Sequence, residues 1–318
     1  MSPRTVSTGL RIGTLACLAG ALALPFVRRR LRVGAVPTMT VMAAAPVALA
    51  VVTPRTPRRD VALFFLHMWA YLVAHELPYD DPERLRRRLR IRYPIVVDRA
   101  LGAGTLPNAR LQKWLSRPEG RTLDTVLTWT HWLWFLEPYA ALLWIRSRDE
   151  RRFARGARQM GACFDLGALT YAAVPTAPPW WASEEGHTDE AVRRLMVEQG
   201  ERTWGGAWPV LYGFFGGNPW AAMPSVHFGT SVMAAVLLGE VGPAERAAGW
   251  AYATTLGFAL VYLGEHYVID LVAGASVVAA VRTADRAAEP LGHALSARIQ
   301  RLERLAGTRR LRFRPGSM

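Results

Sequence analysis

Hydrophobic residues in this chain gather into long runs that are separated by clusters of arginine. Runs of this kind are typical of helices that cross a lipid bilayer. Because the bilayer interior has no water to satisfy backbone hydrogen bonds, a spanning run of this kind predicts an α-helix. The pattern therefore predicts an all-α integral membrane protein, with apolar runs at residues 12–27, 33–52, 61–75, 122–145, 160–174, 222–238, 247–263 and 267–281.

The first 60 residues form a predicted N-terminal membrane anchor region. The run 12–27 is followed directly by the arginine-rich stretch 28–32, without a clean small-x-small cleavage site before it. This favours a retained anchor over a cleaved signal peptide. The run 33–52 is rich in alanine and contains Pro37 and Pro46, so it either spans the membrane or lies at its surface. We therefore expect one or two additional membrane helices before the main bundle.

Two polar stretches are predicted to carry structure of their own. Residues 81–92 are dense in arginine with apolar residues interleaved, a pattern of an amphipathic interfacial helix or, alternatively, of a solvated one. Residues 175–220 form the longest polar excursion, with prolines near the start and several glycines later, which predicts an ordered cap with a short helix near 190–198. Its aromatic residues are suited either to lining a lipid entrance or to resting on the membrane.

These patterns predict a division of the remaining chain into three parts. Residues 61–121 would hold a membrane helix and the interfacial region, and residues 122–285 the catalytic helical core with the excursion. Residues 286–318 would form a basic cytoplasmic tail.

Charge placement predicts the orientation in the membrane. The segment 146–158, which we expect to form a loop, and the tail 282–314 are strongly basic, whereas the excursion 175–220 carries six acidic residues against three arginines. Basic segments are retained on the cytoplasmic side of membranes. The excursion is therefore expected on the extracytoplasmic face, in the plasma membrane, although the basic stretch 84–92 would lie on the same outer side against this tendency.

The net charge of +14 comes almost entirely from arginine, because Lys113 is the only lysine. Such a charge could indicate nucleic-acid binding, but no nucleic-acid motif accompanies it, and the clusters flank apolar runs. Attraction to anionic lipid headgroups explains this placement better. The expected partners are membrane lipids and a lipid phosphate substrate, with no nucleic acid, and the oligomeric state stays open.

Cysteine and histidine usage predicts neither a disulfide framework nor a metal site. Cys17 and Cys163 both lie within apolar stretches, and the seven histidines do not form a metal-binding motif such as His-Glu-x-x-His. We therefore expect no metal and no other cofactor.

Candidate chemistry lies near the C-terminal end, at His227, His266 and Asp270. His266 and Asp270 are four residues apart, so on a helix they share one face, where the carboxylate would orient the imidazole. His227 opens the apolar run 222–238, close to helix amides that favour an anion. The turns between the last three runs are too short for anything but antiparallel neighbours, which puts both histidines at one membrane face.

A lone histidine at a helix start is usually a cap or a satisfied polar residue, but the three side chains together indicate phosphoryl transfer. His266 would attack the phosphorus, and His227 would protonate the leaving oxygen. Ser225 is a candidate substrate ligand through its hydroxyl. His131, inside the run 122–145, is interpreted as a packing or hydrogen-bonding group and stays outside the expected site.

Pro224-Ser225-Val226-His227 and His266-Tyr267-Val268-Ile269-Asp270 resemble the second and third signature motifs of the type 2 phosphatidic acid phosphatase superfamily. Residues 171–180 and Ala221-Ala222-Met223 are similar to the branch that includes inositol phosphorylceramide synthases. The resemblance covers roughly residues 96–282. It implies a six-helix bundle and a metal-independent mechanism through a phosphohistidine, with His266 as nucleophile, Asp270 as its partner and His227 as general acid.

The sequence departs from the hydrolytic members of that superfamily in two places. It has no Lys-x6-Arg-Pro motif, and Ala259 and Leu260 stand where those members carry a phosphate-binding Ser-Arg pair. The phosphate is then expected on Ser225, on backbone amides or on another arginine. A phosphotransferase that moves a phospho-headgroup to or from inositol fits better than a plain phosphatase of phosphatidic acid or polyprenyl phosphate. The alternative from another class is a non-catalytic membrane scaffold or lipid carrier.

Overall fold

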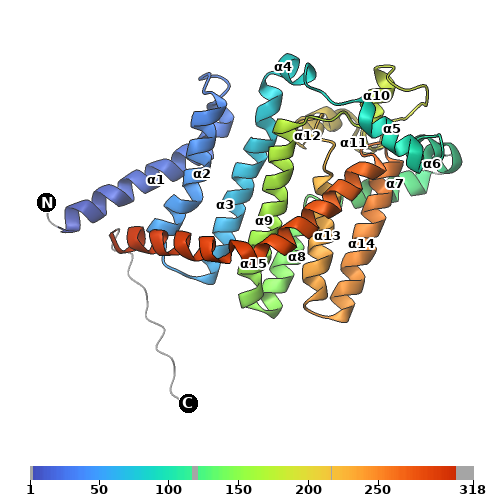
Figure 1. The fold of residues 1–318 in the computed structure, drawn as a ribbon. Helices are drawn as coiled ribbons and strands as arrows, with labels where there is room; N and C mark the ends of the chain where they lie inside the picture. The colour runs from blue at the N-terminus through green and yellow to red at the C-terminus, as the bar shows by residue number, and fades with distance from the viewer. Residues whose placement is uncertain (1–2, 117–120, 216, 306–318) are drawn as a thin grey trace. The chain divides into compact units, whose positions relative to one another are not determined.

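The computed structural model describes residues 3–116, 121–215 and 217–305. Over these residues the chain is helical, and its β-structure is limited to isolated bridges between Arg90 and Thr176 and between Thr176 and Ala221. The chain divides into two compact units, one of Met1–Leu77 with Ala284–Met318 and one of Pro78–Thr283 (Figure 1). The all-helical prediction is confirmed for the described residues, whereas the count of six core helices stays a prediction.

The first unit is built on three apolar helices: α1 (Pro3–Val27), α2 (Ala35–Val52) and α3 (Pro57–Glu76). Stretches within or overlapping all three are long and apolar enough to cross a membrane: Thr8–Val27, Ala35–Val52 and Pro57–Asp80. The protein is accordingly an integral membrane protein. Small side chains on α1 and α2 pack against α3 in a core of Ala21, Met42, Ala45, Ala70 and Val73, which agrees with the close approach that small residues allow between membrane helices.

Within this unit, a buried ion pair joins the start of α3 to the end of the last helix. Arg59, in the first turn of α3, donates to the carboxylate of Glu303 at 2.9 Å, and both side chains are buried. Arg55 donates to the same carboxylate at 3.1 Å. Two arginines therefore share one glutamate near the end of the last helix.

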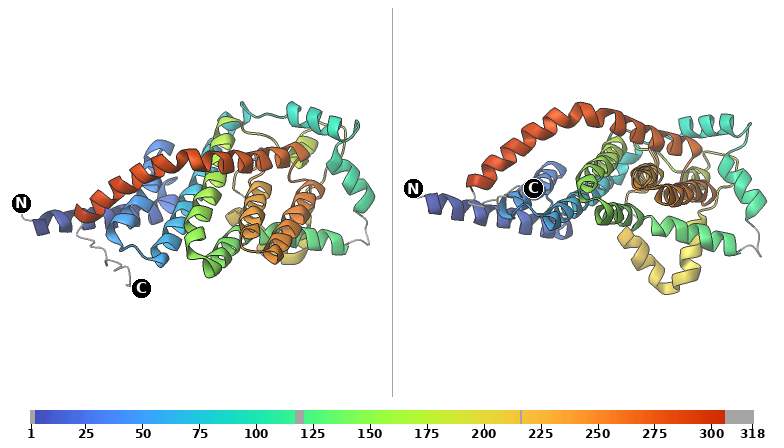
Figure 2. Two further views of the ribbon diagram at one scale, coloured as in Figure 1. Left: turned by 60° about the horizontal axis from the view of Figure 1, so that its bottom comes forward. Right: turned by 90° about the horizontal axis from the view of Figure 1, so that it is seen from below.

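The second unit holds the candidate chemistry. Its elements are η1 (Leu77–Asp80), α4 (Pro82–Arg86), α5 (Arg92–Leu101), α6 (Pro107–Leu115), α7 (Arg121–Leu133), α8 (Glu137–Arg148), α9 (Glu150–Ala173), α10 (Pro179–Glu184), α11 (Leu195–Trp204), η2 (Gly205–Ala207), α12 (Trp208–Phe215), α13 (Val226–Gly239), α14 (Pro243–Tyr262) and the first part of α15 (Val268–Leu305). Helices α8 and α9 form one antiparallel pair, and α13 and α14 form another (Figures 1 and 2).

The run 122–145, predicted as one span, is two helices. The amides of Trp134, Phe135 and Leu136 each bond three residues back, and α8 begins with Pro138 in its first turn. Proline has no amide hydrogen to donate to the carbonyl four residues earlier, so the helix cannot continue through it. The break puts Trp134 at the end of α7, where it reaches the candidate site.

The prediction of one interfacial helix over residues 81–92 is also wrong. Helix α4 ends at Arg86, and the next helix begins only at Arg92. Between them the Arg90 amide donates to the carbonyl of Pro175, and the Arg90 carbonyl accepts from the amide of Ala177. These bonds to the excursion hold the Arg90 backbone in an extended conformation, which outweighs the local amphipathic pattern.

Two further boundaries differ from the sequence pattern. The segment 146–158, predicted as a loop, is mostly helical, because Asp149 caps α9 by accepting from the amide of Arg151 at 3.0 Å. The helix expected near 190–198 lies at Leu195–Trp204 instead. The Glu190 carboxylate accepts from the amide of Leu106 and pairs with Arg99, which keeps that part of the excursion out of a helix.

The helices that carry the histidines pack closely in the second unit. Short turns join α13 to α14 and α14 to α15, as predicted. A β-carbon on Gly229 would lie 2.9 Å from the carbonyl oxygen of Gly274, and one on Gly274 would lie 2.4 Å from that of Ser225. Only glycine allows this approach of α13 and α15, which brings the starts of the two helices together.

Candidate active site

The two histidines meet at one end of the helical bundle. His227 lies in the first turn of α13 and His266 just before α15, and Nε2 of His266 is 3.3 Å from Nδ1 of His227. His266 is 3 % exposed, whereas His227 is only partly buried, so the site opens on the His227 side. The predicted convergence of the two imidazoles is confirmed.

Asp270 lies on the other side of the His266 ring. Its Oδ2 is 3.4 Å from Nδ1 of His266 and also accepts from the amide of Tyr267 at 2.9 Å. The carboxylate is fully buried. A carboxylate beside Nδ1 favours the proton on that nitrogen, which leaves the lone pair on Nε2, the atom that faces His227.

Aromatic side chains frame His227. The ring of Trp134 lies 4.1 Å from that of His227 between centroids, and the Trp134 indole donates to Thr230, one turn farther along α13, at 2.8 Å. His131 follows at 5.0 Å from His227 and is buried. Trp134, at the break between α7 and α8, therefore packs against His227 together with His131. The single span expected from the sequence did not predict this contact.

The start of α15 is fixed by two buried polar residues. The Asp98 carboxylate accepts from the amides of Val268 at 2.7 Å and Ile269 at 3.0 Å, and Asn108 donates to the carbonyl of His266 at 2.9 Å. Burial raises the pKa of Asp98, and the hydrogen bonds from the two amides offset this only in part. These contacts set the backbone on both sides of His266.

Amides at the starts of α13 and α15 already have partners within the protein. Ser225, fully buried, caps α13 by accepting from the amide of Phe228 at 3.2 Å, and the amide of Val226 donates to the hydroxyl of Tyr171. The amides of Val268 and Ile269 donate to Asp98. The capping position of Ser225 orders the helix start, and its expected role as a substrate ligand stays a prediction.

An arginine from the excursion binds Glu265, the residue before His266. Arg194 forms a two-point ion pair with Glu265 at 3.0 and 3.1 Å, donates to the hydroxyl of Tyr212 at 2.6 Å and stacks over Trp180 at 4.0 Å. Burial alone would raise the pKa of Glu265, but the charge and hydrogen bonds of Arg194 outweigh it and lower that pKa. Glu265 in turn lies within electrostatic reach of His266.

Arg194 is the residue of this site that sequence reasoning missed. The sequence shows a few arginines in an acidic excursion, but nothing in its pattern distinguishes Arg194 from Arg193, which pairs with Glu198 at the surface. The available signal was Glu265 beside the candidate nucleophile, because a buried carboxylate needs a cationic partner. Within the described ranges, no three His, Cys, Asp or Glu side chains form a group suited to holding a metal ion.

With this geometry in place, comparison with known proteins gives the family. The PAP2 superfamily, that of the type 2 phosphatidic acid phosphatases, matches residues 95–284, which include both histidines and Asp270. The chain belongs to this superfamily. A similar protein is the inositol phosphorylceramide synthase catalytic subunit aur1 of Schizosaccharomyces pombe, 30% identical over 130 residues.

That alignment covers 37% of this chain and 29% of the relative, so the chain spans less than a third of the length of the curated protein it matches. The match agrees with the branch expected from the motifs. No solved structure matches the chain.

Proposed function

We propose that this PAP2 protein is a membrane enzyme that transfers a phosphoryl or phospho-headgroup from a lipid phosphate or phosphodiester through a phosphohistidine on His266. The observation that carries the proposal is the pairing of the two imidazoles at 3.3 Å, with Asp270 on the far nitrogen of His266. This is the arrangement of a nucleophile, its orienting carboxylate and an acid.

In the first step, Nε2 of His266 attacks phosphorus and forms a phosphorus–nitrogen bond while the bond to the leaving oxygen breaks. His227 gives its proton to that oxygen, which departs as an alcohol such as a diacylglycerol. Asp270 stabilises the positive charge that develops on the His266 ring. Proton donation of this kind accelerates such reactions by roughly 10²- to 10⁴-fold.

In the second step, an acceptor hydroxyl attacks the phosphohistidine. His227, now without its proton, takes the hydroxyl proton as the new phosphorus–oxygen bond forms and the bond to His266 breaks. Water as acceptor gives hydrolysis, and a polyol such as inositol gives transfer. The name of the fungal relative, a synthase, favours transfer.

We assign the phosphate-binding cation to Arg194. Four amides at the two helix starts, those of Val226, Phe228, Val268 and Ile269, are bonded within the protein, so a cationic side chain is needed to balance the negative charge of the substrate. Arg194 uses three of its five N–H donors on Glu265 and Tyr212, which leaves two for a phosphate oxygen. Its stacking on Trp180 holds the guanidinium plane in place.

The proposal is tested on purified protein with a panel of lipid phosphates and phosphodiesters, with and without inositol, and with products identified by mass spectrometry. We expect consumption of one lipid class, and an inositol-containing product if transfer is correct. Release of inorganic phosphate without any added alcohol would favour plain hydrolysis. EDTA is expected to leave the reaction rate unchanged. Loss of activity on addition of EDTA would contradict the metal-free mechanism.

The matched control is His266→Ala, checked for folding by its thermal unfolding in detergent. We expect no turnover and no acid-labile, base-stable phosphoryl group on this variant, whereas the parent protein shows both. Near-normal turnover in the variant would defeat the mechanism. Unchanged lipid binding by His266→Ala, together with no effect of vanadate on the parent protein, would indicate a scaffold or carrier.

A further inference from the structure

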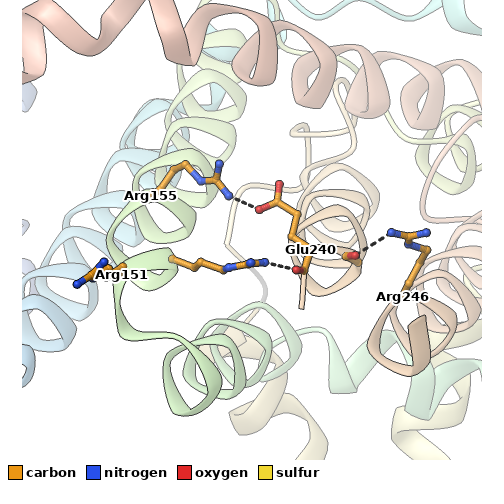
Figure 3. Close-up of a pocket in the computed structure, with 6 residues that line it drawn as sticks. Arg151, Arg155, Glu240 and Arg246 are labelled. Atoms are coloured by element: carbon orange, nitrogen blue, oxygen red, sulfur yellow. Dashed lines mark hydrogen bonds and ion pairs between the residues drawn. The ribbon is translucent and has the colours of Figure 1, made fainter. Parts of the chain in front are cut away.

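The second unit has a basic hollow at the C-terminal end of α13, whereas His227 lies at the N-terminal end of the same helix. It is lined by Arg151, Arg152, Arg155, Gly239, Glu240 and Arg246, and we call it the arginine hollow (Figure 3). Helix α13 separates it from His227 by twelve residues, or about 18 Å at the usual rise of a helix. The hollow is therefore distinct from the candidate active site.

Glu240 is the centre of this cluster. Arg155 pairs with its carboxylate, Arg282 donates to the same carboxylate at 2.8 Å, and Arg152 donates to its carbonyl. Arg246 donates to the neighbouring carbonyl of Gly239 at 2.9 Å. In Figure 3, Arg155 and Arg246 approach the Glu240 turn from opposite sides.

The positive charge of the cluster exceeds what its carboxylates can balance. Four arginines, Arg152, Arg155, Arg246 and Arg282, contact the turn at Gly239 and Glu240. Arg151 also lines the hollow, with its side chain directed away from Glu240 (Figure 3). The carboxylates of the cluster are those of Glu240 and of Asp149, which accepts from Arg152 at 2.9 Å. The guanidinium groups are also only partly used, because Arg155 and Arg246 each use one of their five N–H donors in these contacts. The hollow thus offers unused donors and uncompensated charge, which are the two requirements of a phosphate site.

Neighbouring residues mark the depth of the hollow relative to the membrane. The indole of Trp144, near the end of α8, donates to Glu245 at 3.3 Å, and Arg148 stacks over the same ring at 4.6 Å. Trp144 is 45% exposed. Exposed tryptophan beside arginine is typical of the interface where lipid headgroups lie.

We propose that the arginine hollow binds the phosphate of an anionic lipid headgroup in the leaflet opposite the active site. The chemistry recognised is a phosphate ester held by several guanidinium groups, and the source is the membrane lipid, because the hollow lies at headgroup depth. This inference is independent of the proposed reaction, since it concerns the other end of α13.

The test measures lipid retention by native mass spectrometry of delipidated protein in detergent. Phosphatidylglycerol is the anionic probe, phosphatidylcholine the neutral one, and inorganic phosphate a competitor. The variant Arg151→Gln/Arg246→Gln removes two arginines that contribute least to the internal contacts of the cluster. The control Arg193→Gln/Arg202→Gln removes two arginines that share Glu198 in the excursion.

We expect the parent protein to retain one more phosphatidylglycerol than the hollow variant, with affinity falling about fivefold for each arginine removed. Phosphatidylcholine retention should not change, and the control variant should behave like the parent. Equal retention by parent and hollow variant, or an equal loss in the control, would overturn the proposal. Displacement of phosphatidylglycerol by an equal concentration of inorganic phosphate would refute the assignment to a lipid.

Glu240→Gln gives a result of opposite sign that does not depend on the first variant. Loss of the carboxylate frees donors on Arg155 and Arg282, so phosphatidylglycerol should bind about fivefold more tightly. Thermal unfolding checks that the variant is folded. Weaker or unchanged binding by the folded variant would contradict the proposal.

Discussion

At the scale of single residues, the proposed roles of the two histidines can be separated with substrates that differ in their leaving group. The loss of turnover in His227→Ala should depend on the leaving group, whereas that in His266→Ala should not. We expect His227→Ala to lose roughly 10²- to 10⁴-fold in turnover with an alkyl phosphate lipid. With a lipid that carries a nitrophenyl phosphate, whose leaving oxygen needs no proton, the first step of this variant should be largely restored.

His266→Ala should stay inactive with both substrates, because the nucleophile itself is missing. The measurement is the burst of nitrophenol release in rapid-mixing experiments. A nitrophenol burst from His266→Ala, or none from His227→Ala, would reverse the assignment of the two roles.

Arg194 gives a second prediction at this scale. Arg194→Gln should lower kcat/KM by about 10- to 100-fold, the loss expected for one hydrogen bond to a charged group. Arg194→Lys should recover little of it, because an ammonium cannot keep the two-point contact with Glu265 and the stacking on Trp180. Arg193→Gln is the matched control and should retain the parent kcat/KM.

The sequence predicts some site residues and not others for a physical reason. The convergence of His227, His266 and Asp270 follows from helix periodicity and short turns, which are local properties. The approach of Arg194 to Glu265 depends on how a long excursion folds back onto the bundle. No periodicity in the sequence encodes that placement.

At the scale of helices, the contact between α13 and α15 supports the site geometry. In Gly274→Ala the new methyl group would meet the Ser225 carbonyl at 2.4 Å, so the two helices must separate. We expect a stability loss of about 1–3 kcal/mol and a larger fall in activity, because His227 and His266 move apart with the helices. Thermal unfolding and turnover measure the two effects.

Gly213→Ala is the control for this variant, because apart from the adjoining residues and the backbone of its own helix nothing lies within 4 Å of the added β-carbon. Its activity and unfolding temperature should match those of the parent protein. A folded Gly274→Ala protein with full activity would show that the close packing is not needed to pair the histidines.

The pairing of the excursion with α5 predicts a dependence on pH. Hydrogen bonding and the charge of Arg99 lower the pKa of Glu190 from its ordinary value of 4.5 to about 2. A carboxyl whose pKa is lower in the folded state stabilises the fold above its unfolded pKa and loses this effect as pH falls toward the folded pKa. The contribution of Glu190 should therefore disappear between about pH 4.5 and pH 2.

Proteolysis of the excursion at fixed temperature across this range measures the effect. Glu190→Gln should be cleaved faster than the parent near pH 5 and should show a smaller change in rate on acidification. A parent-like pH profile in Glu190→Gln would assign the dependence to another group.

The apolar runs of the sequence predicted the positions of helices but not all of the residues at which the helices end. The break before Pro138 replaces one expected span by two helices, and the backbone pairing of Arg90 with residues 175 and 177 interrupts another expected helix. In the first case the signal was in the sequence, because proline disfavours a helix interior. In the second case the partner lies far along the chain, so local pattern alone could not reveal it.

At the scale of the whole molecule, the charge distribution predicts the orientation of the second unit. Asp189→Cys, in the excursion, should react with a membrane-impermeant thiol reagent in intact cells. Ala244→Cys, in the first turn of α14 near the arginine hollow, should react only after permeabilisation. Both are made in a Cys17→Ser background, since Cys163 is buried. The reverse pattern of labelling would place the active site on the cytoplasmic face.

The origin of the site residues has a consequence for engineering. His266, Asp270 and His227, the proposed nucleophile, its carboxylate and the proposed acid, belong to the helices or turns of the bundle, whereas Arg194 and the ring beneath it belong to residues 175–220. In the proposed mechanism, the residues that react and the residue that binds the phosphate therefore lie in separate segments. Grafting this one segment from a relative that takes another headgroup should exchange selectivity while the machinery that breaks the phosphorus–oxygen bond stays as it is.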